Sequence, residues 1–342
     1  MIQLPVKSSP LALRVYRNHH LRYLLFGAVL CTMPLLASMG FIRVSVLTTL
    51  GSVLIYSIAA LGLNLLLGYS GLISLGVAGF MGLGAYLAAF ALKELGLSVW
   101  IAVLAAVALP TLIGLLVGLV SLRISGIYLA IATLCVSEIL LKTFEEVEPF
   151  SGGMRGMTIR YPSVFGFQLN RESVYLILVV VLVLVMMLTH NLVSGQFGRA
   201  LHAMRGSESA ARAMGVNLLK YRLIVFALST AYAGLAGALY VFFIRASYPT
   251  TWGLTLSLNL VAAIVVGGFR SVYGSVVGAF VIWAMSDLIL KQLPIIGEMT
   301  GVPFIVTGIL IIIIILFYPN GLRYIPYDIK RLAGRIVKRR KA

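Results

Sequence analysis

The chain has 342 residues, of which 61% are hydrophobic and only 11% are charged. Soluble proteins usually carry about 25% charged residues, so this composition excludes a soluble globular domain. The net charge is +17. In a soluble protein that balance would favour a nucleic-acid partner, but beside long apolar runs it is typical of the cytoplasmic surface of a membrane protein. We expect an all-α polytopic membrane protein, because the strands of a membrane β-barrel would alternate apolar and polar residues.

Both ends of the chain are rich in positive charge. We interpret residues 1–21 as a cytoplasmic basic arm and residues 323–342 as a cytoplasmic basic tail, because basic residues beside membrane spans mark the cytoplasmic side. We also expect the tail to contact anionic membrane lipid, and we expect no nucleic-acid partner. The basic residues in and next to these segments are Lys7, Arg14, Arg17, Arg22, Arg323, Lys330, Arg331, Arg335, Lys338, Arg339, Arg340 and Lys341.

Nine apolar runs fill the region between the two ends, which we assign to a transmembrane domain of residues 22–322. Most of them approach the length of about 20 residues that an α-helix needs to cross a bilayer. The runs are residues 22–40, 45–67, 73–92, 99–122, 126–141, 174–193, 222–245, 258–289 and 303–318.

Two polar connections indicate how the chain is oriented. Residues 142–173 hold four basic and four acidic residues, whereas residues 194–222 hold five basic residues and one acidic residue. Cytoplasmic loops carry the excess of Lys and Arg. We therefore predict an external loop at 142–173 and a cytoplasmic loop at 194–222.

The orientation of the basic tail requires a break within residues 258–289. If this run were one span, the C-terminus would lie outside. We predict a short descending segment near 258–267, a glycine-rich turn at 268–274 and an ascending helix near 275–290, which gives about ten membrane segments. A descending segment of about 10 residues is too short to span at 1.5 Å per residue, so its backbone should be buried in protein or line a cavity.

A second glycine-rich break is predicted at residues 68–84. Both breaks follow the triplet Leu-Asn-Leu, at 63–65 and 258–260, which indicates a faint internal repeat. Interrupted segments in corresponding halves of a transporter point to its binding site. Glycines that only allow close helix packing are an equally good interpretation, and the pattern leaves both open.

No catalytic constellation or metal-ligand spacing accompanies these features, so we expect a transporter and not an enzyme. The chain has no nucleotide-binding motif, and its energy would come from an ion gradient or from a separate ATPase. Ion-coupled carriers usually hold acidic residues inside their spans. Here the candidates are Glu138 and Asp287. The simpler interpretation is that each forms an i, i+4 salt bridge, Glu138 with Lys142 and Asp287 with Lys291.

The cytoplasmic loop carries the most local information. Its sequence predicts two short helices joined at Gly206-Ser207, with Ser207 as a cap and Gly215 as a C-terminal stop. Arg199, His202 and Arg205 should share one face of the first helix. Such an element can dock into a groove on a cytoplasmic partner or lie on lipid headgroups, and composition does not decide between the two.

At this point the chain resembles a known family, the branched-chain amino-acid ABC permeases. Five segments carry the resemblance, in the order that the family has them, across residues 45–325. The external Ser-Gly-Gly favours a LivM-type subunit over its LivH-type partner. The segments are Leu63 to Tyr86, Ser151-Gly152-Gly153 with Gly156, Phe197 to Asn217, Leu235 to Gly274, and Leu316 to Leu322. The chain departs from the family at Val77, where histidine is common, and at Arg155 and Arg270.

The resemblance implies a permease subunit in the bacterial inner membrane with both termini cytoplasmic. It implies three kinds of partner: a second, LivH-like permease subunit, two cytoplasmic ATPases and a periplasmic substrate-binding protein. No cofactor is expected in this chain, because the ATPases bind the ATP. The substrates would be branched-chain or related neutral amino acids.

The resemblance also places two groups of candidate residues. The 194–222 loop would couple to the ATPase, and the glycine-rich breaks would shape the translocation pathway. The coupling candidates are Arg199, Arg205, Glu208, Arg212 and Gly215. The pathway candidates are Asn64, Gly68, Tyr69, Ser70, Gly71, Ser74, Gly76, Asn259, Gly267 and Gly268. Two alternatives stay open: an ABC permease for urea, amides or a sugar, and an ion-coupled secondary transporter.

Overall fold

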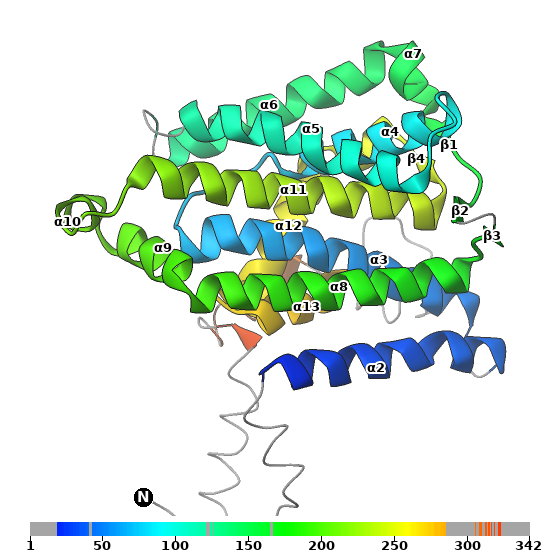
Figure 1. Cartoon of the computed structure of the whole chain (residues 1–342), viewed down its shortest axis with the longest axis horizontal. Coiled ribbons are helices and arrows are strands. Elements are labelled where there is room, and N and C mark those ends of the chain that lie inside the picture. Colours follow the sequence, from blue (N-terminus) through cyan, green and yellow to red (C-terminus); the bar gives the residue numbers. More distant parts are fainter. Residues whose placement is uncertain are drawn as a thin grey trace, which may run out of the picture.

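The computed structural model describes residues 19–40, 43–120, 124, 126–164 and 167–284, and isolated residues between 305 and 322. Residues 1–18 of the predicted arm, the whole predicted tail (323–342), Asp287, Lys291 and most of the predicted last span lie outside these residues, and the first described helix begins inside the predicted arm, at His19. Element labels follow Figure 1.

The described chain is mostly helical. Seven helical stretches are long and apolar enough to cross a membrane, which makes the protein a multi-pass membrane protein. The main helices are α2 (His19–Ser38), α3 (Val44–Leu63), α4 (Val77–Lys93), α5 (Val99–Val120), α6 (Ile127–Glu146), α8 (Arg171–Ser194), α11 (Leu218–Ile244), α12 (Leu254–Gly267) and α13 (Val272–Ala279). Helix α3 continues into a π-helical turn, η1 (Asn64–Tyr69), and α13 into another, η4 (Phe280–Ala284).

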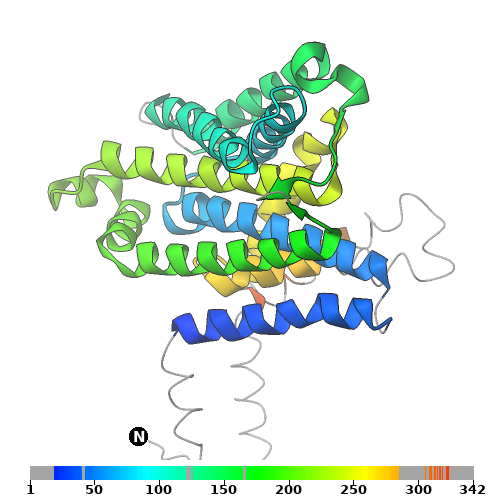
Figure 2. The ribbon, with the colours of Figure 1, turned by 45° about the vertical axis from the view of Figure 1, so that its right-hand side comes forward.

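Two helices form the centre of the bundle. Helix α11 packs against α3, α4 and α5, and α3 also contacts α8, α12 and α13. In the most apolar 18-residue stretch of α3 and its π-helical turn, 83% is buried, against 17% in the corresponding stretch of α2. Helix α2 accordingly lies at the edge of the bundle in both views (Figures 1 and 2).

Small residues let the central helices approach closely. A Cβ on Gly84 would overlap the Gly234 backbone, and a Cβ on Gly237 would overlap the Met81 carbonyl oxygen. Close backbone approach of this kind is how helices associate when lipid removes the hydrophobic driving force. For residues 77–84, the packing interpretation of the glycines is therefore correct, because this stretch is helical and the break is confined to residues 70–76.

The two ends of the bundle differ in structure (Figure 1). The α10 end holds two short helices, α9 (Gln196–Gly206) and α10 (Glu208–Ala213). The β end holds α7 (Glu148–Ser151), two 3₁₀ turns, η2 (Gly153–Arg155) and η3 (Pro249–Trp252), and four two-residue strands. Strand β1 (Met157–Thr158) pairs antiparallel with β4 (Ala246–Ser247), in the register Met157 to Ser247. Strand β2 (Ser163–Val164) pairs with β3 (Phe167–Gln168).

One predicted loop, one predicted ion pair and one predicted turn differ from the structure. The connection predicted at 142–173 is shorter, because α6 continues to Glu146 and α8 begins at Arg171. Lys142 forms its ion pair with Glu145, at 2.5 Å, and not with Glu138. The break within 258–289 is confirmed, but its turn covers only 268–271, because Ser271 caps α13 through a bond from Gly274 N.

The descending arm of this break is also longer than predicted. Helix α12 has 14 residues, and with η3 it forms a 19-residue stretch from Pro249 to Gly267 that is long enough to cross the membrane. The prediction was too short because it counted only the apolar run after Leu258. Two glycines, Gly267 and Gly268, end the helix.

Candidate functional site

The two chain breaks meet at the α10 end of the bundle, and Asn64 joins them. Asn64 is buried at the first position of η1. Its amide nitrogen donates to the Ser271 carbonyl at 3.1 Å and to Ser275 Oγ at 2.8 Å. Its amide oxygen accepts from the Arg270 backbone N–H at 3.2 Å. We name residues 64–71 and 267–275 the helix-break junction.

Glycines make this close approach possible. A Cβ on Gly68 would overlap Asn64 Oδ1, and a Cβ on Gly267 would overlap the Gly274 carbonyl oxygen. Gly71 and Gly268 have φ angles of 77° and 104°, a region where side chains are strained. Arg270 nevertheless adopts φ 58°, and such outliers persist only where the surrounding structure holds them. A further segment of the chain reaches the junction at Gly321, which packs on Gly267 and Gly268.

Most pathway candidates of the first break are buried and bonded within the chain. Ser70 Oγ donates to the Leu66 carbonyl at 2.5 Å, and Ser74 Oγ accepts from Gly76 N at 3.4 Å. Gly76 precedes α4 where a Cβ would lie 2.6 Å from the Thr133 carbonyl oxygen of α6. The buried Tyr69 ring lies edge-on to His202, with 5.6 Å between ring centroids.

Asn259 does not belong to this group. It lies half-buried on α12, eight residues before Gly267, which is about 12 Å along the helix. The predicted correspondence between the two Leu-Asn-Leu triplets therefore does not extend to their position, because Asn64 lies at the junction itself and Asn259 lies two turns away from it.

Helices α9 and α10 confirm the local predictions for the coupling loop. The bend falls at Gly206-Ser207, where Ser207 Oγ accepts from Ala210 N at 3.3 Å. Gly215 has φ 83° and ends α10, with its N–H bonded to Arg212 O and the next N–H bonded to Ala211 O. This pair of bonds is the Schellman motif that glycine favours.

The coupling candidates divide into two that face inward and two that face outward. Arg205 donates to the Gly68 carbonyl, and its guanidinium carbon lies 5.8 Å from the centroid of the Phe269 ring. Glu208 forms an ion pair with the buried Arg222 of α11. Arg199 and Arg212 are exposed, and neither forms an ion pair within the described part of the chain.

Positive charge gathers where α9 meets the junction. Burial, together with Arg270 and Arg205, lowers the pKa of His202. Burial and Arg270 also lower the pKa of Arg205. Because both shifts disfavour the charged forms, the approach of α9 to the junction is opposed by like charges, and carbonyl and ring contacts hold it.

A pocket of about 500 Å³ lies beside this contact, and Arg205 and the end of α9 at Gly206 are part of its lining. Its lining includes Ser70, Gly71, Met204, Ser207 and Phe269. Both the first break and the coupling helices thus border one space, which gives them room to move relative to each other.

Comparisons with known proteins identify the family. The model of the family described as "Branched-chain amino acid transport system / permease component" matches residues 45–317. The chain belongs to this family. It is therefore an ABC permease of the branched-chain amino-acid family, and its homologues are membrane subunits that are not themselves enzymes.

Individual relatives agree with this assignment. The permease is 28% identical to the high-affinity branched-chain amino acid transport system permease protein LivM of Escherichia coli K12, over 84% of this chain and 71% of that protein. It is 29% identical to a probable branched-chain amino acid transport permease protein LivH of Methanocaldococcus jannaschii, over 75% and 82%. It is 28% identical to the ribose import permease protein RbsC of E. coli K12, over 76% and 81%. No solved structure matches the chain significantly.

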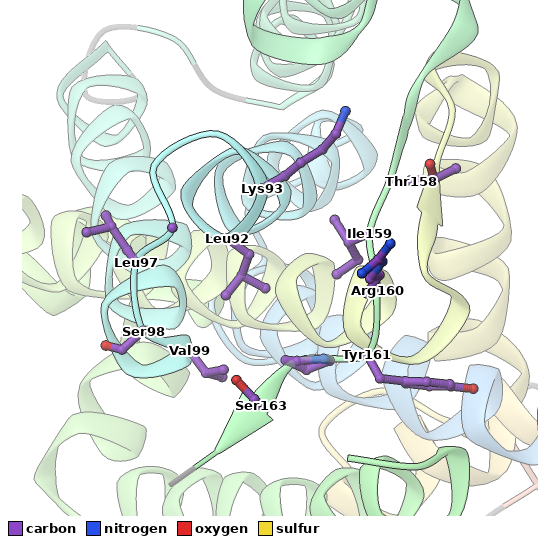
Figure 3. A pocket seen from close by; sticks show the side chains of 12 residues that line it. Leu92, Lys93, Leu97, Ser98, Val99, Thr158, Ile159, Arg160, Tyr161 and Ser163 are labelled. Atoms are coloured by element: carbon purple, nitrogen blue, oxygen red, sulfur yellow. The ribbon is translucent and has the colours of Figure 1, made fainter. Parts of the chain in front are cut away.

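The β end holds a larger pocket, of about 720 Å³, between the α4–α5 connection and residues 158–163 of the permease. Figure 3 shows that its charged and aromatic side chains do not converge, because Lys93 and Tyr161 point away from each other. Lys93 pairs with Glu94 at 3.5 Å, and the Tyr161 ring lies under Arg245 at 4.5 Å. Because the candidate residues from the sequence gather at the other end, we place the candidate functional site at the α10 end.

Sequence reasoning missed several residues of the junction. Ser271 and Ser275 follow the second break and bond to Asn64, Phe269 contacts Arg205, and Arg222 pairs with Glu208. A serine three residues before Gly274 is a recognisable helix cap and could have been found. The partners of Phe269 and Arg222 have no local signal.

Proposed function

We propose that the chain is a permease subunit of an ATP-driven ABC importer for branched-chain or related neutral amino acids. It would form the translocation pathway together with a second permease subunit. Two cytoplasmic ATPases would drive it, and a periplasmic binding protein would deliver the substrate. Family membership implies a complex with other subunits, and the identity of these partners is part of the proposal.

The observation that carries the proposal is the outward surface of α9 and α10. At the far end of the molecule (Figure 1), Arg199, Arg212 and Met214 are exposed, and Met214 is 84% exposed. Their inner neighbours Met204 and Ala211 are buried against the bundle. A helical element that exposes an apolar side chain together with cations fits a helix-in-groove contact with a partner protein.

The same surface favours a protein partner over lipid headgroups. An element that lies on a membrane keeps its apolar face in the lipid. Here the apolar face of α9 packs on the permease itself, through Leu201 and Met204. Movement of an ATPase pair would then reach the bundle as a rigid-body rotation of α9 and α10.

Orientation follows from the basic residues. We propose an inner-membrane location with the α10 end cytoplasmic and the β end periplasmic. In this orientation the arm (1–21) and the tail (323–342) would both be cytoplasmic, and the chain would have about ten membrane segments. The two short apolar helices, α4 and α13, would add to the seven long stretches.

The substrate assignment relies on the relatives. Two of them are named for branched-chain amino acids and one for ribose, so a sugar is the second candidate. Thermal-shift screening of the cognate binding protein decides between them. A response to leucine, isoleucine or valine is expected, and a response to ribose or urea alone would overturn the substrate assignment.

The energy source needs a separate experiment. Uptake should stop when the ATPase genes are deleted and should continue when the proton gradient is collapsed with ATP held constant. The opposite pattern would make the chain an ion-coupled carrier, in which Glu138 of α6 would be the first residue to test.

The outward surface can be tested by substitution. Arg212→Glu and Met214→Asp should reduce association with the ATPase in pull-down from detergent, while the permease still inserts in the membrane. Ala203→Ser, an exposed change on α9, serves as the control. Normal association of both charged variants would contradict the proposed contact.

A further inference from the structure

Arg205 connects three parts of the permease. Its backbone belongs to α9, its guanidinium donates to the Gly68 carbonyl of the first break, and it lies against the Phe269 ring of the second break. The stem of the side chain passes over Gly71, whose missing Cβ would lie 3.1 Å from Arg205 Cγ.

The junction behind Arg205 is built to move as one body. Asn64 ties the first break to the second through three hydrogen bonds, of which the two to Ser271 and Ser275 are buried. Gly267 and Gly274 pack backbone to backbone. Buried and fully bonded polar groups rigidify the structure around them, so we expect motion at the surface of the junction and not inside it.

The contact of Arg205 with this body is of a different kind. Arg205 and His202 are exposed, and Arg270 stands close enough to repel both. A hydrogen bond and a cation–π contact favour the closed arrangement, while like charge opposes it. A contact that like charge opposes is suited to open and close during a cycle.

We propose that Arg205 is a positioning residue that latches α9 to the helix-break junction, and that release of this latch frees the α10 ends of α3 and α12 during transport. Arg205 thus acts inside the permease, whereas Arg199, Arg212 and Met214 form the surface for the partner. The inference rests on the proposed function in one respect only, namely that a partner ATPase moves α9.

The first experiment separates the latch from the partner surface. The full complex with Arg205→Gln is reconstituted in proteoliposomes, and the substrate transported per ATP hydrolysed is measured. We expect normal assembly and hydrolysis with a fall of about tenfold in transport per ATP, within the 5–150-fold range of allosteric couplings, and partial recovery with Arg205→Lys. Wild-type transport by Arg205→Gln, or a loss of ATPase association equal to that of Arg212→Glu, would overturn the latch.

The second experiment uses a disulfide to hold α9 against the first break. In a Cys31→Ser, Cys135→Ala background, Gly71→Cys and Arg205→Cys are combined. A Cβ on Gly71 would lie 3.7 Å from Arg205 Cβ, close to the separation of about 3.8 Å in disulfides. We expect a disulfide to form under mild oxidation, to abolish the uptake that remains after loss of the Arg205 side chain, and to restore that remaining uptake on reduction. The two single-cysteine variants control for strain at Gly71.

The outcomes of the locking experiment distinguish the two proposals. An absence of cross-linking, or full uptake by the cross-linked permease, contradicts the latch whatever the energy source. A reversible block in cells whose uptake does not depend on the ATPase genes supports the latch and contradicts the proposed function. A reversible block in cells whose uptake does depend on those genes supports both.

Discussion

The two ends of the permease hold their polar groups in different ways. At the β end, Ser247 is fully buried, accepts from Tyr86 Oη at 3.3 Å and from Trp252 Nε1 at 2.9 Å, and belongs to a strand pair. At the α10 end, α9 packs on the bundle through Leu201 and Met204 and reaches the helix-break junction through the exposed Arg205, which faces a like charge. The β end is a fixed cap, and the α10 end is a joint that can be released.

The largest effect should come from a substitution inside the helix-break junction, which is the rigid part of the α10 end. Gly267→Ala would place a Cβ on the Gly274 carbonyl oxygen, and overpacking of this kind costs about 1–3 kcal/mol. We expect a clear fall in thermal stability in detergent, followed by fluorescence or by aggregation. Gly206→Ala, where a Cβ meets nothing within 4 Å, is the matched control. Equal stability of both variants would contradict the close packing of the junction.

Asn64→Leu should have the next largest effect. It keeps the volume but removes the donor to the buried Ser271 carbonyl and Ser275 Oγ, and a buried polar group that loses its partner costs about 1–3 kcal/mol. We expect lower thermal stability together with less transport per ATP, because the two breaks no longer move as one body. Asn259→Leu should change transport per ATP much less. If the two asparagine variants behaved alike, Asn64 would have no special role.

A substitution at the β end sharpens the comparison. Ser151 donates to the Phe144 carbonyl at 2.6 Å and accepts from Gly153 N at 3.1 Å. Ser151→Ala should cost about 1 kcal/mol of stability and leave transport per ATP unchanged, since this end is a cap. A change in the coupling ratio at unchanged expression would show that the β end also takes part in the cycle.

The smallest effect concerns pH. The pKa of His202 is lowered in the folded protein, so as pH falls from about 6.5 the unfolded chain takes up the proton first. The contribution of His202 is therefore full above that pH and declines below it, where His202 becomes a third cation beside Arg205 and Arg270. His202→Gln should flatten the acid side of the stability profile between pH 7.5 and 5. An unchanged profile would contradict the charge cluster.

Local signals made much of the α10 end predictable from sequence. A glycine followed by serine gave the bend between α9 and α10, Gly215 gave the stop, and charge balance gave the break after Gly267. These features depend on a few neighbouring residues. The extent of α12 was misjudged because its first residues, Leu254 to Ser257, follow a turn rather than an apolar run.

The partners across the joint could not be predicted. Asn64 and Ser275 are 211 positions apart, and Arg205 and Gly68 are 137 apart. The sequence predicts one shared face for Arg199, His202 and Arg205, but in the structure His202 and Arg205 contact the bundle and Arg199 faces outward, because the docking of α9 divides them. Helical periodicity does not show how α9 docks, and the resemblance to the family placed Arg199 and Arg205 in the same group of coupling candidates.

The most direct test of the joint is a double-mutant cycle between Arg205 and Phe269, with transport per ATP as the readout. Arg205→Gln, Phe269→Leu and the double variant are compared with a second cycle in which Arg212→Gln replaces Arg205→Gln. A cation–π contact at an exposed site is worth about 0.5–1 kcal/mol. The account predicts non-additivity of that size in the first cycle and additivity in the second. Additive effects of Arg205 and Phe269 would contradict the claim that α9 is latched to the helix-break junction.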